Sequence, residues 1–142
     1  MSESVYDLVI LGAGSGGYAA ALRASQLGLK VALIEGDKVG GTCLHRGCIP
    51  TKAYLHAAET ADAIRESDTF GVQATLQGID MAKVGQYRDS IINKLFRGVQ
   101  GLLSSRGVDV IEGWGRLASP DIIEVHGRRI VGRNIILATG SY

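Results

Sequence analysis

The stretch VYDLVILGAGSGG, residues 5–17, decides the fold. Its first part is a Val- and Ile-rich run broken only by Asp7, which predicts one buried strand over residues 5–11. The glycines that follow stop this strand. An Ala-rich segment, residues 17–27, then favours a helix, and a second apolar run predicts another strand over residues 30–35. A span of about 30 residues is the usual length of a β-α-β unit, whose two strands are parallel.

The glycines between this strand and helix follow the pattern Gly12-x-Gly14-x-x-Gly17. Gly12 permits a tight turn, Gly14 lets the backbone approach a pyrophosphate, and Gly17 lets the helix pack closely on the strand. The N-terminus of the helix offers free N–H groups to an anion. Glu35 ends the second strand, where an acidic residue hydrogen-bonds a ribose hydroxyl and repels the 2′-phosphate of NADP. The pattern predicts a dinucleotide site but does not separate FAD from NAD, and a Gly-rich turn without ligand stays the alternative.

The rest of the chain continues the alternation of helices and strands. Two helices and a final buried strand are expected, at residues 44–66, 80–106 and 134–138. Three short runs separated by turn residues predict a small antiparallel β-meander, at Val108–Ile111, Ile122–Val125 and Ile130–Val131. We therefore expect an α/β fold: a Rossmann-like domain with a parallel sheet, helices and a β-meander.

Composition narrows the class of protein further. The 142 residues are 46% hydrophobic and 20% charged, which fits one globular domain. The net charge of +1 gives no sign of a nucleic-acid or membrane-surface partner. The first residues lack the basic and apolar regions of a secretory signal, and no apolar run approaches the ~18 residues of a membrane span. We expect a cytoplasmic protein.

The two cysteines, Cys43 and Cys48, lie in the stretch GGTCLHRGCIPTK, residues 40–52. In a regular helix, residues five apart have Cα atoms roughly 8–9 Å from each other. A disulfide tolerates at most about 7 Å, so a bridge here requires a distorted first turn, which Gly47 and Pro50 would permit. A zinc site needs about four ligands, and the three histidines form no matching cluster, so no metal is expected. Two unrelated buried thiols stay the alternative.

This stretch resembles the active-site motif of the FAD-dependent pyridine-nucleotide disulfide oxidoreductases, which include dihydrolipoamide, glutathione and mercuric reductases. Leu44, Ile49 and Thr51 look most like the dihydrolipoamide dehydrogenase branch, because the other two reductases usually carry Val after each cysteine. The pair His45-Arg46 departs from the commoner Asn-Val. The segment IILATG, residues 135–140, is similar to the family's second FAD motif, so the resemblance covers nearly the whole chain.

The resemblance implies the chemistry. It assigns Cys48 to the flavin-facing thiol and Cys43 to the interchange thiol that a dihydrolipoyl group attacks. Electrons then pass to FAD and on to NAD. Lys52, one helical turn after Cys48, would favour the thiolate and the reduced flavin. The resemblance thus implies three catalytic residues, Cys43, Cys48 and Lys52.

The resemblance also implies which residues contact the cofactor. Gly41 and Thr42 would lie at the pyrophosphate or ribityl region, and Gly115 would make a backbone contact to the adenine. Thr139 and Gly140 would close the site from the last strand. The remaining expected contacts are Gly12, Gly14, Gly17, Glu35, Cys43 and Lys52. Trp114 is expected to serve packing.

Family members are much longer than this chain. Residues 1–142 are expected to be the N-terminal part of the FAD-binding domain, without the NAD-binding and dimer-interface domains. The parent would be a homodimer acting on the dihydrolipoyl group of the acyltransferase of a 2-oxo acid dehydrogenase complex. Alone, this segment would have at most FAD affinity and a reducible cysteine pair, and it would be inactive as an enzyme. The alternatives are a reductase of the mercuric or glutathione type and a non-catalytic FAD-binding fragment.

Overall fold

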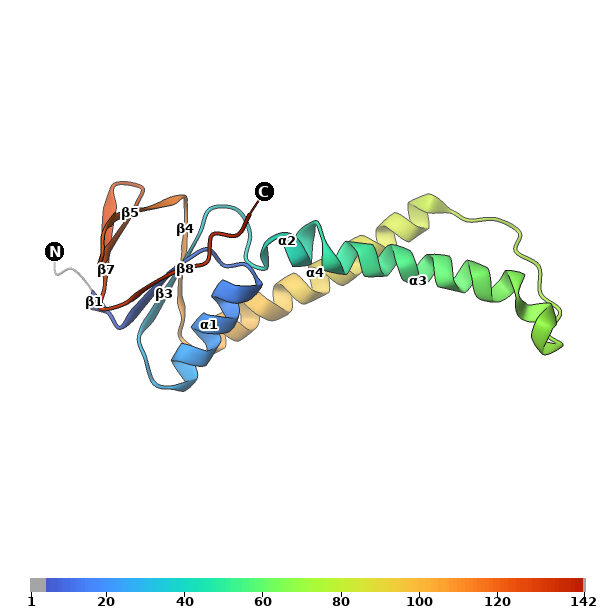
Figure 1. Cartoon of the computed structure of the whole chain (residues 1–142), viewed down its shortest axis with the longest axis horizontal. Helices are drawn as coiled ribbons and strands as arrows, with labels where there is room; N and C mark the ends of the chain where they lie inside the picture. Colours follow the sequence, from blue (N-terminus) through green and yellow to red (C-terminus); the bar gives the residue numbers. More distant parts are fainter. Residues whose placement is uncertain (1–4, 142) are drawn as a thin grey trace.

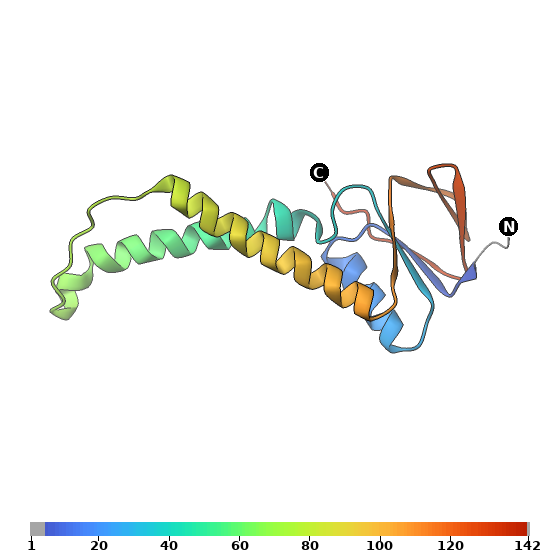
Figure 2. The same cartoon turned by 180° about the vertical axis from the view of Figure 1, so that it is seen from behind.

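Two sheets and a long helical hairpin make up the protein, of which the computed structural model describes residues 5–141 (Figure 1). The sheets and the first helix form a body at one end, and the hairpin extends from this body (Figures 1 and 2).

The first sheet is parallel throughout and has the strand order β4-β3-β2-β8. Its strands are β2 (Leu8–Leu11), β3 (Val31–Glu35), β4 (Asp109–Glu112) and β8 (Ile135–Leu137). Helix α1 (Ser15–Gln26) connects β2 to β3, so the predicted β-α-β unit is confirmed. Starting from β2, the chain adds β3 and β4 on one side and β8 on the other. Ligands of such sheets bind beyond the carboxyl ends of the strands at this switch point, which is where the glycine motif lies.

The second sheet is the β-meander, with the strand order β1-β7-β6-β5. Its strands are β1 (Val5–Tyr6), β5 (Gly115–Ser119), β6 (Ile122–Val125) and β7 (Arg128–Gly132). Strands β5, β6 and β7 are antiparallel neighbours, while β1 joins β7 in parallel. The predicted α/β fold with a small meander is confirmed.

The prediction of one strand over residues 5–11 is wrong, because Asp7 separates β1 from β2 and the two belong to different sheets. The carboxylate of Asp7 accepts the backbone N–H of Lys30 at 2.9 Å, and its own N–H donates to the Lys30 carbonyl at 2.9 Å. These bonds turn the chain where an uninterrupted strand was expected.

Two further strand predictions need correction. The run Val108–Ile111 was expected in the meander, but β4 pairs in parallel with β3, because α4 returns the chain to that edge of the sheet. The strand that pairs with β6 in its place is β5. Its sequence, GRLAS, has little β-branched content and so gave little sign of a strand. Strand β8 was expected to be buried, yet Leu137 is 58% exposed, because β8 is an edge strand.

The expected helix over residues 44–66 is also wrong, since the chain forms two helices there. They are α2 (Gly41–His45) and α3 (Cys48–Arg65), followed by the short η1 (Ser67–Phe70). Helix α4 (Met81–Ser105) then runs back alongside α3 to the body and contacts α1 (Figures 1 and 2). Asp80 caps α4 by accepting two N–H groups of its first turn, at 3.0 and 3.1 Å. Gly107, with a φ of +67°, follows its end.

Both faces of the parallel sheet are covered, which fixes the position of its strand ends. Alternate residues of β2 and β3 point to opposite faces. Ile10 and Leu33 pack towards α1 and α4, whereas Val9 and Ile34 pack against the meander, and all four are fully buried. Burying such a side chain contributes about 1.5–3 kcal/mol. The order of layers is therefore helices, parallel sheet and meander.

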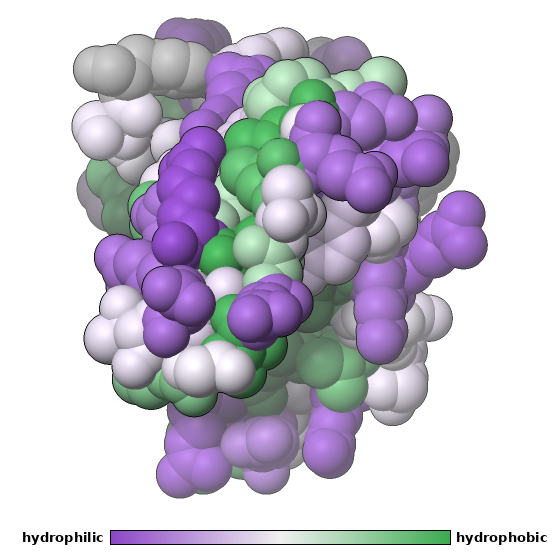
Figure 3. All heavy atoms as spheres, turned by 90° about the vertical axis from the view of Figure 1, so that its right-hand side faces the viewer, coloured by the Kyte–Doolittle hydropathy of each residue, from purple (hydrophilic) through white to green (hydrophobic). Residues whose placement is uncertain are grey.

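The hairpin leaves apolar side chains open to solvent. Seen from its outer end, hydrophobic residues form a band between hydrophilic ones (Figure 3). Phe70 and Met81, near this end, are 80% and 62% exposed. Among residues 5–141, no helix combines the length and the apolar character that crossing a membrane requires.

Candidate functional site: a cleft beside a disulfide

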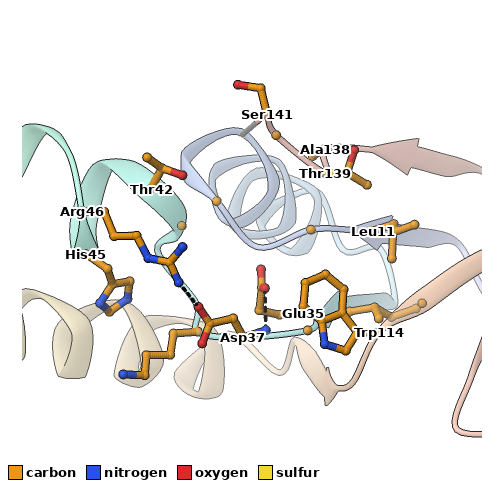
Figure 4. Close-up of a pocket in the computed structure, with 18 residues that line it drawn as sticks. Leu11, Glu35, Asp37, Thr42, His45, Arg46, Trp114, Ala138, Thr139 and Ser141 are labelled. Carbon is orange, nitrogen blue, oxygen red and sulfur yellow. Dashed lines mark hydrogen bonds and ion pairs between the residues drawn. The ribbon is translucent and has the colours of Figure 1, made fainter.

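A cleft opens at the carboxyl ends of the parallel strands, with a cavity volume of about 170 Å³ (Figure 4). Residues from β2, β3, α2, the start of β5 and the segment after β8 meet there, although they are far apart in the sequence. The cleft thus lies at the switch point of the sheet.

Eight of the eleven residues predicted to contact a cofactor line this cleft. They are Gly12, Gly14, Glu35, Gly41, Thr42, Gly115, Thr139 and Gly140. Gly17, Cys43 and Lys52 do not line it. Gly17 is buried beneath the cleft, where a Cβ would collide with the carbonyl oxygen of Gly12, which is the close helix–strand packing predicted for it.

The floor of the cleft is backbone without side chains. Gly12 has a φ of +100°, and a Cβ there would collide with the carbonyl of Ala138. A Cβ on Gly41, whose φ is +61°, would lie 2.7 Å from Cα of Gly14. The N–H of Gly40 donates to the carbonyl of Ala13 at 2.8 Å, which also ties the start of α2 to the glycine loop. Since the backbone is bare at the N-terminal end of α1, a phosphate can approach its N–H groups closely. The residues present therefore fit the pyrophosphate of a dinucleotide.

The carboxylate of Glu35 is held in the cleft by two hydrogen bonds. One carboxylate oxygen accepts the N–H of Ala13 at 2.7 Å. The other accepts the N–H of Asp37 at 2.9 Å (Figure 4). These bonds hold the carboxylate between the glycine loop and the turn after β3. A carboxylate has further acceptor capacity, so it can still receive a ribose hydroxyl.

An ion pair crosses the rim of the cleft. Arg46, in the turn between α2 and α3, contacts Asp37 at 2.9 Å, and both side chains line the cleft (Figure 4). Both are more than half exposed, so the pair adds little to stability. It does join the turn between the two cysteines to the turn after β3.

Cys43 and Cys48 form a disulfide with a Cα–Cα distance of 4.7 Å. The expected distortion is confirmed, since α2 ends at His45, α3 begins at Cys48, and Gly47 between them adopts a non-helical conformation. Pro50 lies in the first turn of α3, where its missing N–H costs no helical hydrogen bond. Cys43 is half-buried and Cys48 is exposed. The two thiols are therefore paired, not unrelated.

Lys52 lies one turn beyond Cys48 on α3 and is exposed. Across residues 5–141 no carboxylate lies within ion-pair distance of its ammonium group. In the same part of the chain, no three His, Cys, Asp or Glu side chains come together as a metal site requires.

Ten of the 18 residues that line the cleft were not predicted to contact a cofactor, and Arg46 and Trp114 are among them. Arg46 was given no role, although it is a cation between the two cysteines. Trp114 was expected to serve packing, but it is 72% exposed and lines the cleft. Its glycine neighbours, Gly113 and Gly115, were a signal, because they offer no side chains for the indole to pack against.

These features, a dinucleotide cleft with a disulfide one short helix away, define a class of protein. The chain belongs to the pyridine nucleotide-disulphide oxidoreductase family, which matches residues 6–142. It is 47% identical over 136 residues to the dihydrolipoyl dehydrogenase of Thermus scotoductus, across 96% of this chain and 29% of that protein. It is 42% identical over 149 residues to the dihydrolipoyl dehydrogenase of Bacillus subtilis, across 96% of this chain and 31% of that protein.

A solved structure shares the architecture. The Cu(II) complex of HOCl-induced flavoprotein disulfide reductase RclA from Escherichia coli matches with a TM-score of 0.80 at 28% identity, over 96% of this chain and 29% of that chain. The resemblance predicted from the sequence is therefore confirmed. The chain spans 29% and 31% of the length of the two curated relatives named above.

Proposed function

We propose that this chain is the FAD-binding, disulfide-carrying segment of a dihydrolipoyl dehydrogenase. The observation that carries the proposal is the contact between Gly41, the first residue of α2, and Gly14 in the glycine loop. Because α2 also contains Cys43, this contact sets the disulfide directly beside the dinucleotide cleft. A structural disulfide has no need of such a neighbour, whereas a redox disulfide needs a cofactor within reach.

The cysteine pair would act by thiol–disulfide exchange. One thiolate of a dihydrolipoyl group attacks Sγ of Cys43, the Cys43–Cys48 bond breaks, and Cys48 leaves as a thiolate. The second lipoyl thiol then displaces Cys43 from the mixed disulfide. Two electrons and two protons pass from the lipoyl dithiol to the cysteine pair, so lipoamide is oxidised and the protein disulfide is reduced.

Other residues of this chain would bind and orient. The glycine loop and Thr42 would hold the pyrophosphate of FAD, and Glu35 would bind the adenosine ribose. At the two ends of the cleft, the cofactor would be bound by Gly115, Thr139 and Gly140. Lys52 would stabilise the Cys48 thiolate through its charge. FAD, when bound, supplies the two-electron carrier between the dithiol and NAD.

The complete reaction would need an electron acceptor and a partner that these residues do not supply. We propose that the whole protein acts as a cytoplasmic homodimer with NAD as final acceptor and the dihydrolipoyl acyltransferase of a 2-oxo acid dehydrogenase complex as partner. The names of the relatives support the dihydrolipoyl group as the substrate.

The proposal is tested by counting thiols in the FAD-loaded chain after anaerobic addition of one equivalent of dihydrolipoamide. Alkylation and mass spectrometry should find Cys43 and Cys48 reduced together, and reduction by glutathione should be much slower. A glutathione preference would favour the glutathione reductase type instead. An intact disulfide after both treatments would contradict any redox role.

A matched pair of variants tests the assignment of the two thiols. In the FAD-loaded chain, Cys48→Ser leaves Cys43 as the thiol that meets lipoamide, while Cys43→Ser leaves Cys48. The first variant should form the mixed disulfide with lipoamide faster, because the bound flavin would cover the thiol of Cys48 and leave the thiol of Cys43 open to lipoamide. Equal rates would show that Cys48, which is the more exposed cysteine here, is not covered by the flavin.

A further inference from the structure

Trp114 lies between β4 and β5 in an unusual setting for the largest side chain of the protein. It is 72% exposed, yet one face of its ring is held. A Cβ on Gly36 would lie 2.6 Å from Cδ2 and 2.8 Å from Cε2 and Cε3 of the indole. Because three atoms of the ring are almost equally near, the backbone of Gly36 sits against the flat face of the indole. The ring is therefore positioned and accessible at the same time.

The surroundings of Trp114 mark one end of the cleft. Gly36 directly follows Glu35, so the indole lies beside the carboxylate placed for a ribose (Figure 4). Leu11 and Ile34 supply apolar lining on the same side. A group attached to that ribose would meet an aromatic ring and aliphatic side chains, which suit a flat purine base and not a phosphate.

We infer that Trp114 is a cofactor-binding residue whose indole stacks on the adenine base of the bound dinucleotide. This inference rests on the proposed function and adds to it a side-chain contact beyond the backbone contact expected at Gly115. Base–aromatic stacking is tolerant of sequence and strong enough to change affinity measurably. The adenosine half of the cofactor would thus be bound by Glu35 at the ribose and by Trp114 at the base.

The chain contains a single tryptophan, so tryptophan fluorescence reports on Trp114 alone. Titration with ADP, which carries the adenosine half, should quench this emission saturably. Inorganic pyrophosphate, which lacks the base, should leave the emission unchanged. Quenching by both ligands, or by neither while calorimetry shows ADP binding, would overturn the inference.

Variants give a second readout that does not depend on fluorescence. By calorimetry, Trp114→Ala should weaken ADP binding about tenfold, the effect of losing one base–aromatic stack, and Trp114→Phe should restore most of it. Phe70→Ala is the matched control, because Phe70 is an exposed aromatic residue remote from the cleft, and it should leave the affinity unchanged.

Two failures are distinguishable. If Trp114→Ala binds ADP as tightly as the parent chain, the stacking inference fails while the dinucleotide cleft stands. If neither ADP nor FAD binds the parent chain, the cleft and the stacking inference fail together.

Discussion

Substituting Gly41 by Ala tests the contact that joins the disulfide helix to the glycine loop. Gly41 has a φ of +61°, and a Cβ there would lie 2.7 Å from Cα of Gly14, about 1 Å closer than carbon atoms pack. An Ala in the left-handed region costs about 1–2 kcal/mol. Overlap with backbone, which cannot rotate aside, adds about 1–3 kcal/mol. We expect Gly41→Ala to lower the free energy of unfolding by about 2–5 kcal/mol.

Gly71→Ala separates the two contributions. Gly71 has a similar φ of +75°, but a Cβ there would meet nothing within 4 Å. This control should therefore lose only about 1–2 kcal/mol. Urea denaturation followed by circular dichroism measures both values. Equal losses in the two variants would refute the close approach of Gly41 to Gly14.

The same pair should differ in cofactor affinity. Displacing the Gly14 backbone weakens at least one charge-assisted hydrogen bond to a phosphate, which corresponds to about a tenfold loss. Flavin fluorescence titration should show this loss for Gly41→Ala and no loss for Gly71→Ala. An unchanged affinity in Gly41→Ala would place the pyrophosphate elsewhere.

Three further outcomes are expected. Glu35→Gln should weaken FAD binding about tenfold, measured by flavin fluorescence, because one charge-assisted bond becomes neutral; undiminished affinity would remove Glu35 from the ribose site. Asp80→Ala should destabilise the chain by about 1 kcal/mol in urea, since α4 loses the acceptor of two N–H groups, and a neutral effect would refute the cap. Burial and the hydrogen bond to Asp109 raise the pKa of Tyr6 above 10.0. The folded state therefore keeps the Tyr6 proton to a higher pH than the unfolded state does. The stability that Tyr6 contributes is complete below pH 10.0 and is lost as the pH rises through the raised pKa. Tyr6→Phe should flatten that alkaline loss, and a variant with the parent's pH profile would assign the loss to another group.

Local patterns were sufficient to predict the part of the fold that holds the cleft. The β-α-β unit over residues 8–35 follows from two apolar runs, the Ala-rich run between them and the glycines after the first strand. The break at Gly47 was also predictable, because the geometry of a disulfide is incompatible with five residues of regular helix.

Strand pairing was less predictable, because it depends on contacts between distant segments. Nothing local in Val108–Ile111 shows that α4 delivers it to the edge of β3. Asp7 looked like a tolerated polar residue within a strand, but its bonds to Lys30 turn the chain into a second sheet. The position of the Trp114 indole likewise depends on Gly36, which comes from another part of the chain.

The measurement that bears most directly on the central claim is the visible spectrum of the FAD-loaded chain before and after one equivalent of dihydrolipoamide, recorded without oxygen beside Cys48→Ser. If Cys48 lies against the flavin once the disulfide opens, the parent chain should gain absorption at the long-wavelength side of the flavin band. The variant should gain none. A parent chain that binds FAD but shows the same spectrum before and after the dithiol would contradict the pairing of this disulfide with the cofactor cleft.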